Sequence, residues 1–400
     1  MKHFFIFDPQ LLFYGFAIIF FASYGQTFFI SIFNTEIRAL YNLTDGEFGL
    51  IYAIGTLLSS FCLIGFAKLI DHIDLRLYSF IISVGLAVAC LGIYISYNSI
   101  IFLIIIIFSL RFFGQGAMSH AGETTMARYF DKNRGKALSV STLGGMIGVM
   151  VLPIVVVKLT FLVGWKHVWL ISSLSIFLFF IPLLFLALQN QSIRHANFSK
   201  FNNNFSDNKR LRTKDILLDK KFYIYLPISI AFPFIGTGLT FHQIYIINQK
   251  AWSLDILAQG FIFLGIFSII SLILGGPIVD KYNTKKVVLF TLAPLFVAIL
   301  ILIFFNNYYF MFLYMSLLGI ALGIGTPFIG SLWAELYGLE SLGTVKALVH
   351  ASGVFFSALS PVIFGYMIDF GLGIFSLCIM SLFIILISTF LPIIYKKVDE

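Results

Sequence analysis

The chain has 400 residues, of which 60% are hydrophobic and only 11% are charged. Soluble domains are about half apolar and about a quarter charged, so this composition argues against a water-soluble enzyme. Roughly 240 apolar residues, divided by the about 20 that one bilayer crossing needs, allow about twelve spans. Helices are expected, because the apolar runs are too long for barrel strands. In a membrane protein, the net charge of +8 does not indicate nucleic-acid binding; the distribution of the basic residues predicts which side of the membrane each loop occupies.

In chain order, the apolar runs predict twelve membrane-spanning helices. They lie near 11–33, 47–70, 76–97, 99–128, 136–161, 165–188, 222–247, 253–279, 285–305, 308–336, 343–369 and 372–395. The first run is too long for a signal-peptide core and lacks a small-x-small cleavage site, so it is expected to be retained. Cys62, Cys90 and Cys378 lie inside apolar runs without ligand spacing, which predicts neither a disulfide framework nor a metal site.

Twelve spans place both termini on one side, and the basic residues predict which side. With the termini in the cytoplasm, four basic residues lie outside and one lies within the membrane, which leaves 21 of the 26 Lys and Arg inside. The four are Arg38, Lys158, Lys166 and Lys250, and the one is Arg111. This asymmetry follows the positive-inside rule. The abundance of Ile, Phe, Asn and Lys hints at an AT-rich bacterial genome and hence an inner membrane.

A single long polar segment, 189–221, divides the chain. It is rich in Asn, Ser and Lys, which predicts a flexible cytoplasmic linker that also suits anionic lipid. The predicted domains are therefore a six-helix bundle over 1–188, the linker 189–221, and a second six-helix bundle over 222–400.

The two halves resemble one another. A shift of 209 residues carries Asp71 onto Asp280 and Gly114-Gln115-Gly116 onto Gly323-Ile324-Gly325. Near the start of each half, Gly25-Gln26-Thr27-Phe28 recurs as Gly238-Leu239-Thr240-Phe241. The shared order of these matches indicates a duplicated six-helix unit, and many secondary transporters are built from such repeats.

A charged turn occurs at the same place in both halves. Between spans 8 and 9 it reads Gly276-Pro-Ile-Val-Asp280-Lys281-Tyr-Asn-Thr-Lys285-Lys286, and between spans 2 and 3 it reads Ala67-Lys-Leu-Ile-Asp71-His72-Ile-Asp-Leu-Arg76. A small residue lets two helices approach, and a carboxylate at a helix end can accept from amides of the next helix. The pattern resembles the cytoplasmic motif of the major facilitator superfamily, Gly-x-x-x-Asp-Arg/Lys-x-Gly-Arg/Lys-Arg/Lys. The first copy departs from it at Ala67, His72 and Asp74.

The fourth span carries a lone arginine. Leu110-Arg111-Phe-Phe-Gly114-Gln115-Gly116 resembles the Arg-x-x-Gly-x-Gly pattern of that superfamily, and the repeat mate of Arg111 is Ile320. Because a mid-span arginine costs about 2.5–3.5 kcal/mol on insertion, we expect it to face protein or a water-filled cavity. Two roles stay open for Arg111, an anion-binding residue or a hydrogen-bond hub between helices.

A basic stretch before the fifth span indicates a branch of the superfamily. Arg128-Tyr129-Phe130-Asp131-Lys132-Asn133-Arg134 leads into Gly144-Gly145 and Gly148. This stretch is similar to one in the monocarboxylate and oxalate/formate branches. Asn133 and Leu143 depart from that pattern.

The superfamily resemblance implies a central cavity lined by spans 1, 4, 7 and 10. The polar residues on those spans, expected to bind substrate, are Tyr24, Gln26, Thr27, Arg111, Gln115, Thr240, His242, Gln243 and Thr326. One cation among amide and hydroxyl donors suits a small organic anion, because a guanidinium offers paired donors to a carboxylate.

Proton coupling has several candidates. His120 and Glu123 are three residues apart and so share a helix face, and both can titrate when partly buried. If the fourth span is an α-helix throughout, the nine residues from Arg111 to His120 turn through about 180°, which places the two side chains on opposite faces. His242 and His350 are alternative proton carriers, and interhelix or carbonyl bonding is the competing interpretation for each.

The remaining charged residues at the cytoplasmic ends are expected to form a gate. These are Asp71, Arg76, Asp280, Lys281, Lys285, Arg134 and Glu335, with Lys346 near Glu335. No Walker-type phosphate loop, HExxH motif or nucleophile elbow occurs, so neither ATP-driven transport by this chain nor an enzyme is expected.

The sequence thus predicts an all-α integral membrane protein, a secondary transporter that moves a small organic anion, monocarboxylate-like and coupled to protons, by rocking its two halves. It predicts a monomeric symporter in contact with lipid, without a cofactor. An exporter of amphipathic or drug-like compounds and a non-transporting membrane receptor are the alternatives.

Overall fold

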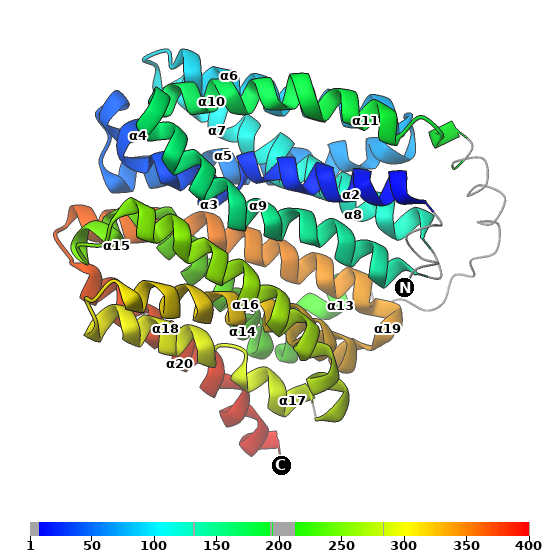
Figure 1. Cartoon of the computed structure of the whole chain (residues 1–400). Coiled ribbons are helices and arrows are strands. Elements are labelled where there is room, and N and C mark those ends of the chain that lie inside the picture. The colour runs from blue at the N-terminus through cyan, green and yellow to red at the C-terminus, as the bar shows by residue number, and fades with distance from the viewer. Residues whose placement is uncertain (1–7, 131–132, 193, 195–212, 283, 400) are drawn as a thin grey trace. The chain divides into compact units, whose positions relative to one another are not determined.

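The computed structural model describes the chain except for residues 1–7, 131–132, 193, 195–212, 283 and 400, and the segments it describes are helices and turns without a strand (Figure 1). Most of the predicted linker 189–221 lies outside the described part of the chain. The helices of the first half are α2 (Pro9–Ala22), η1 (Ser23–Gly25), α3 (Thr27–Ile30), η2 (Ser31–Phe33), α4 (Asn34–Tyr41), α5 (Asp45–Phe66), η3 (Ala67–Asp71), α6 (Leu75–Ile95), α7 (Ile100–Ser109), η4 (Leu110–Met118), α8 (Ser119–Tyr129), α9 (Arg134–Val163), α10 (Trp165–Ser175), η5 (Ile176–Phe180) and α11 (Ile181–Ala187).

The second half begins after the linker. Its helices are α13 (Thr213–Leu217), α14 (Lys220–Phe241), α15 (Gln243–Gln249), α16 (Leu254–Lys281), α17 (Thr284–Val287), η6 (Val288–Phe290), α18 (Ala293–Phe304), α19 (Tyr309–Asp369) and α20 (Ile374–Asp399). Eleven helices in the described part of the chain are long and apolar enough to cross a membrane, or twelve if one bent pair counts as a span. An all-α membrane protein with the predicted number of spans is confirmed.

The chain groups into two compact units. Unit 1 comprises Met1–Asn42 and Ile51–Ser206, and unit 2 comprises Leu43–Leu50 and Asp207–Glu400. Helix α5 begins in the short segment that belongs to unit 2 and continues in unit 1.

In unit 1, the first span is bent rather than continuous. The segments Pro9–Gly25 and Thr27–Tyr41 meet at 43°, and Gln26 between them has extended backbone (φ −83°, ψ 154°). The break lies where Gly25 crosses the fourth span, because a Cβ at Gly25 would come within 2.1 Å of the Leu110 carbonyl oxygen. The span predicted over 11–33 therefore reaches Tyr41 through α4.

The fourth span contains a π-helical segment, Leu110–Met118, between α7 and α8. Each π turn holds more residues than an α turn, so the rotation per residue is smaller than 100°. The 180° separation predicted between Arg111 and His120 assumed an α-helix and is wrong for that reason. The wide turn lies at the Gly25 crossing, where a Cβ on Gly114 would come within 2.8 Å of the Gly25 Cα.

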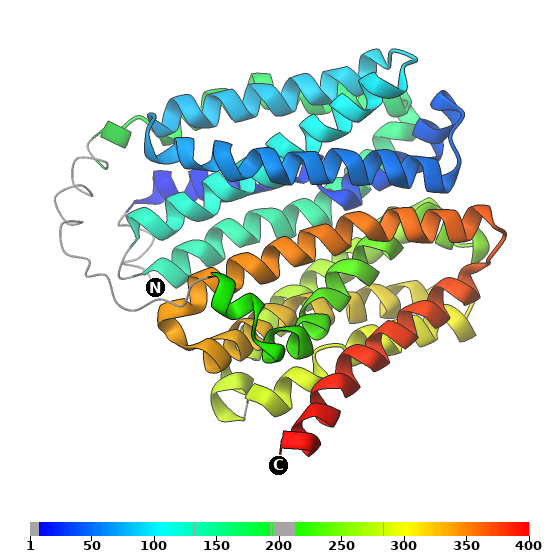
Figure 2. The same ribbon diagram turned by 180° about the vertical axis from the view of Figure 1, so that it is seen from behind.

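In unit 2, α14, α16, α18 and α20 pack on the long helix α19. Two predicted spans are joined in α19, Tyr309–Gly338 and Ser341–Asp369, and the chain turns between them (Figure 2). Gly338 makes this turn with φ 75°, a left-handed conformation that favours glycine. The close helix approach predicted at Gly276 occurs instead at Gly275, where a Cβ would lie 2.6 Å from Pro327 Cγ.

Helix α5 starts with a capping box. The Thr44 amide donates to the Glu47 carboxylate at 2.9 Å, and the Glu47 amide donates to Thr44 Oγ1 at 3.2 Å. The amides of Asp45 and Gly46 donate to the two carboxylate oxygens of Asp369, at 3.0 and 2.8 Å. The first turn of α5 is thus capped by its own residues and by the end of α19.

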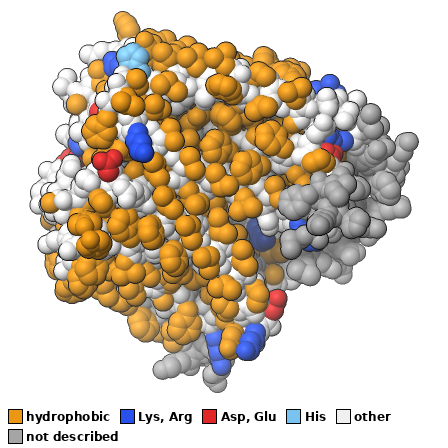
Figure 3. Space-filling view, viewed as in Figure 1, with side chains coloured by type: hydrophobic (Ala, Val, Ile, Leu, Met, Phe, Trp, Pro, Cys, Tyr) orange, Lys and Arg blue, Asp and Glu red, His pale blue; other side chains and the backbone are white. Residues whose placement is uncertain are grey.

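The helix surfaces facing outward are apolar. Large exposed side chains include Phe61, Phe161, Leu162 and Phe370, each more than 70% exposed. Hydrophobic side chains cover the middle of the viewed face, while most charged ones gather toward the helix ends (Figure 3). A soluble protein rarely exposes so much apolar surface, and contact with lipid accounts for it.

Candidate functional site

The Arg111 side chain is buried in unit 1, only 2% exposed. Its Nη1 donates to the Gly25 carbonyl oxygen at 3.0 Å and lies 3.5 Å from Thr27 Oγ1, and its Nε donates to Thr56 Oγ1 at 3.2 Å. The carbonyl becomes available where the first span is broken. The bend in the first span and the π turn in the fourth therefore bring the Arg111 guanidinium against a buried backbone carbonyl at the helix break.

The partners of Arg111 are all neutral. Its Cζ lies 5.0 Å from the centre of the Tyr52 ring, which favours a cation. The Tyr52 hydroxyl is 2.7 Å from Thr27 Oγ1, so tyrosine and threonine hold each other in place. Among the residues that the structure describes, no Asp or Glu lies within 4.0 Å of Arg111. A buried cation surrounded only by dipoles is stabilised further when an anion reaches it.

The other predicted substrate residues of unit 1 differ in their relation to this centre. Gln26 and Gln115 are half-buried, and both are next in sequence to a glycine of the helix crossing, Gly25 and Gly114. The hydroxyl of buried Tyr24 bonds to Ser175 Oγ at 3.0 Å, and its ring packs edge-on against Phe29. Tyr24 is therefore tied to α10 and not to Arg111.

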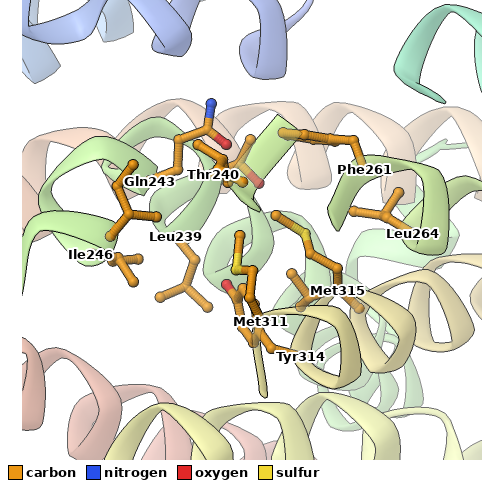
Figure 4. A pocket seen from close by; sticks show the side chains of 12 residues that line it. Leu239, Thr240, Gln243, Ile246, Phe261, Leu264, Met311, Tyr314 and Met315 are labelled. Atoms are coloured by element: carbon orange, nitrogen blue, oxygen red, sulfur yellow. The ribbon is translucent and has the colours of Figure 1, made fainter. Parts of the chain in front are cut away.

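In unit 2, Thr240 and Gln243 line a small pocket with room for about one water molecule. Apolar side chains make up most of the wall, and they include Phe261, Met311 and Met315. Thr240 and Gln243 lie on one side of the pocket and the two methionines and Tyr314 on the other (Figure 4). Thr326 lies outside this pocket and is exposed.

His242 does not line this pocket, although Thr240 and Gln243, which are close to it in sequence, do. It is 1% exposed, and its Nε2 lies 3.0 Å from the Pro361 carbonyl oxygen. Its Nδ1 lies 3.5 Å from Asp45 Oδ1. The structure thus places His242 against a carboxylate rather than in a substrate cavity.

The proposed proton residues of the fourth span are not brought together by a hydrogen bond. The His120 ring nitrogens lie 3.4 Å from Thr124 Oγ1, while Glu123 is exposed. His350 is also exposed, on the second half of α19. A proton role for these three residues stays a prediction.

The gate residues of unit 1 form local contacts. Asp71 pairs with Arg128, which also donates to the Ile70 carbonyl oxygen at 3.3 Å. Arg76 lies 3.9 Å from Asp74, and Arg134 Nε donates to the Ala127 carbonyl oxygen at 2.9 Å. These contacts tie the ends of neighbouring helices to one another.

In unit 2, Lys285 Nζ lies 3.8 Å from Glu335 Oε1, a contact between α17 and α19. The Lys281 ammonium lies 5.5 Å from the centre of the Tyr282 ring, and Asp280 is exposed at the end of α16. Within the described part of the chain, no group of three or more His, Cys, Asp or Glu side chains could hold a metal ion.

Sequence reasoning missed four side chains of these two centres. Tyr52 and Thr56 contact Arg111, and Asp45 and Asp369 belong to the His242 site. Tyr52 and Thr56 are four residues apart, so helical spacing places them on one face of α5, which was an available signal. Asp45 stood in the first turn of a helix, where a carboxylate is usual, and gave no such signal.

A buried lysine was also missed. Lys250, at the end of α15, is 7% exposed and donates to Asn306 Oδ1 at 2.8 Å. Burial lowers the pKa of its ammonium group, and the nearby Cys378 thiol acts in the opposite direction. The Trp252 indole donates to the Asn306 carbonyl oxygen at 2.6 Å, so Asn306 joins both residues.

Solved structures share this fold. A bacterial homologue of the human lysosomal transporter Spinster, in its inward-facing and occupied conformation, matches with TM-score 0.69 and 13% identity, over 97% of each chain. Its unoccupied conformation matches with TM-score 0.66 and 14% identity, over 96% of this chain and 94% of that one. A mutant of the nucleoside transporter NupG matches with TM-score 0.71 and 12% identity, over 98% and 100%. At such low identity these likenesses show the fold alone.

The family is shown by the sequence as a whole. A search of curated proteins finds no match. The model of the Major Facilitator Superfamily matches residues 15–275 and 243–400, which covers nearly the entire chain. The chain therefore belongs to the Major Facilitator Superfamily and is a multi-pass membrane transporter rather than an enzyme.

Proposed function

We propose that this transporter carries a small organic anion, a monocarboxylate or a similar acid, that Arg111 binds the carboxylate, and that transport is coupled to protons. The observation that carries the proposal is the Arg111 centre, a buried guanidinium whose described partners are two threonines, a carbonyl and a tyrosine ring. A carboxylate would supply the missing charge and accept two parallel hydrogen bonds from the guanidinium.

The likeness to the monocarboxylate and oxalate/formate branches supports the same substrate class. It rests on the basic stretch from Arg128 to Arg134, part of which lies outside the described residues. We also propose that both termini are cytoplasmic, that the protein is a monomer of a bacterial inner membrane, and that 1–188 and 222–400 are its domains.

The direct test is a transport screen of the purified full chain in proteoliposomes. Labelled pyruvate, lactate, formate and oxalate are compared with uridine, with and without a pH gradient. We expect uptake and counterflow of at least one acid, faster when an inward proton gradient is imposed. Uptake of uridine but of no acid would contradict the proposal.

One observation favours a second candidate, an exporter of amphipathic compounds. The small unit 2 pocket is walled by Met, Phe and Leu side chains with few polar groups, and flexible methionines would let it widen around the apolar part of a larger solute. Energised efflux of a lipophilic cation such as tetraphenylphosphonium, with no carriage of acids, would favour the exporter. Binding of an acid without counterflow would favour a receptor.

A further inference from the structure

The surroundings of His242 fix which of its ring nitrogens carries a proton. Its Nε2 lies 3.0 Å from the Pro361 carbonyl oxygen, which can only accept a hydrogen bond. Nε2 must therefore be the donor. In a neutral imidazole the other nitrogen, Nδ1, is then a bare acceptor.

This second nitrogen faces a carboxylate. Nδ1 lies 3.5 Å from Asp45 Oδ1, and Nδ1 is buried without a hydrogen-bond partner among the described residues. Two acceptor lone pairs at this distance repel each other, and the repulsion is strong where water is excluded. One proton between them replaces the repulsion with a charge-assisted hydrogen bond.

The neighbouring groups favour adding this proton. The Asp369 carboxylate, from α19, accepts hydrogen bonds from the amides of Asp45 and Gly46 and brings a second negative charge to the same turn. Tyr366 of α19 packs on Gly46, and Tyr245 of α15 interacts electrostatically with Asp45. A single proton offsets part of the negative charge that these two carboxylates bring to the turn.

We propose that unit 2 binds one proton between His242 Nδ1 and Asp45 Oδ1. The presence of this proton does not depend on the proposed function. Its role as the proton that is coupled to transport does rest on the proposed function. The site would take the place of the His120 and Glu123 pair, which no hydrogen bond joins in the described part of the chain.

The position of Asp45 links this proton to a helix that runs from unit 2 into unit 1. The segment Leu43–Leu50 belongs to unit 2, yet α5 continues from it into unit 1. A proton held by both His242 and Asp45 is bound more tightly when this segment is in place than when it is withdrawn. By linkage, proton binding then favours the seated segment, and withdrawal of the segment releases the proton.

The segment Leu43–Leu50 packs closely on α19, so its position can affect how tightly the proton is bound. A Cβ on Gly49 would lie 2.4 Å from the Pro361 carbonyl oxygen, and a Cβ on Gly365 would lie 2.5 Å from the Asp45 carbonyl oxygen. Small displacements of α5 would therefore change the distance from Asp45 to His242, which is anchored on the same Pro361 carbonyl.

Nuclear magnetic resonance of the full chain in lipid nanodiscs locates the proton directly. The histidine rings are labelled with ¹⁵N and the aspartate carboxyls with ¹³C, and His242→Gln and Asp45→Asn identify the signals. At about pH 7.5, where an ordinary histidine is mostly neutral, we expect a proton on His242 Nδ1 or on the Asp45 carboxyl. The exposed His72 provides a reference ring in the same sample.

Each result decides the proposal. In Asp45→Asn the proton should be absent and Nδ1 bare at the same pH, a loss of at least about tenfold in proton affinity for a close charge pair. An ionised Asp45 beside a bare Nδ1 in the wild type, or an Nδ1 that stays protonated in Asp45→Asn, would overturn it. The measurement needs no transported solute, so a failed uptake screen and a failed proton site are distinguishable.

Discussion

An ionisable centre is buried beside a helix crossing in unit 1 and another beside the start of α5 in unit 2, and the two centres differ in sign. Unit 1 holds Arg111 among neutral oxygen atoms and a tyrosine ring, whereas unit 2 holds His242 beside the Asp45 carboxylate, on a turn whose amides donate to Asp369. The repeat that relates the halves places Ile320 opposite Arg111 and Phe29 opposite His242. The duplicated helices thus act as a shared scaffold, and neither Arg111 nor His242 has an ionisable counterpart in the other repeat. One centre suits an anion and the other suits a proton.

The largest expected effect tests the cationic centre. Arg111→Gln removes two charge-assisted hydrogen bonds to a carboxylate, about 3 kcal/mol in total, which corresponds to roughly a hundredfold loss in kcat/KM for an acid. Initial uptake rates in proteoliposomes measure it. Lys158→Gln, which removes an exposed cation from the same unit, should leave transport within about twofold. Equal losses in both variants would contradict a specific role for Arg111.

The helix crossing beside Arg111 should be intolerant of a methyl group, unlike its repeat mate. A Cβ on Gly25 would meet the backbone oxygen of Leu110 at 2.1 Å, whereas a Cβ on Gly238 would meet the rotatable Ser360 hydroxyl at 2.2 Å. Gly25→Ala should destabilise by about 1–3 kcal/mol or more, and Gly238→Ala by less. Thermal unfolding of the two variants in detergent compares them. A similar loss in both would show that the crossing is not special to unit 1.

The proton dependence of transport tests the His242 centre of unit 2. His242→Gln keeps a donor for the Pro361 carbonyl oxygen but cannot titrate, so an inward proton gradient should no longer accelerate uptake. The expected change is the loss of an acceleration of about tenfold, with counterflow retained. His350→Gln, at an exposed position, is the control. Loss of the acceleration in His350→Gln alone would move the proton role to α19.

The smallest effect concerns the gate. Lys285 and Glu335 lie 3.8 Å apart, and their side chains are 46% and 38% exposed. A double-mutant cycle with Lys285→Gln and Glu335→Gln should give a coupling of about 0.2–1 kcal/mol in unfolding free energy, as for other exposed pairs. A coupling well above that range would make this pair a third strong centre.

The fold was largely predictable from hydropathy, because a membrane span must be apolar over about 20 residues. The bend at Gln26 and the π turn from Leu110 to Met118 were not predictable. Both depend on the crossing of Gly25 and Gly114, which is a contact between segments far apart in the chain. Local periodicity carries no information about such a contact.

The two centres differed in predictability for an electrostatic reason. A charge in the middle of an apolar run is costly, so Arg111 stood out from the sequence alone. Asp45 and Asp369 lie at helix ends, where carboxylates are common, and His242 was one of several candidate histidines. These residues meet only in the folded chain. The Asp45 amide and the Asp369 carboxylate that it donates to are 324 residues apart in the sequence.

The assignment of Arg111 as the anion site is best tested by the ratio of lactate uptake to lactamide uptake in the wild type and in Arg111→Gln. The two solutes differ in the carboxylate, and a ratio cancels any loss of folded protein. If Arg111 binds the carboxylate, the wild type should prefer the acid by about a hundredfold or more, and the ratio should be near one in the variant. An acid preference that survives in Arg111→Gln, or none in the wild type, would contradict the assignment of Arg111 as the anion site.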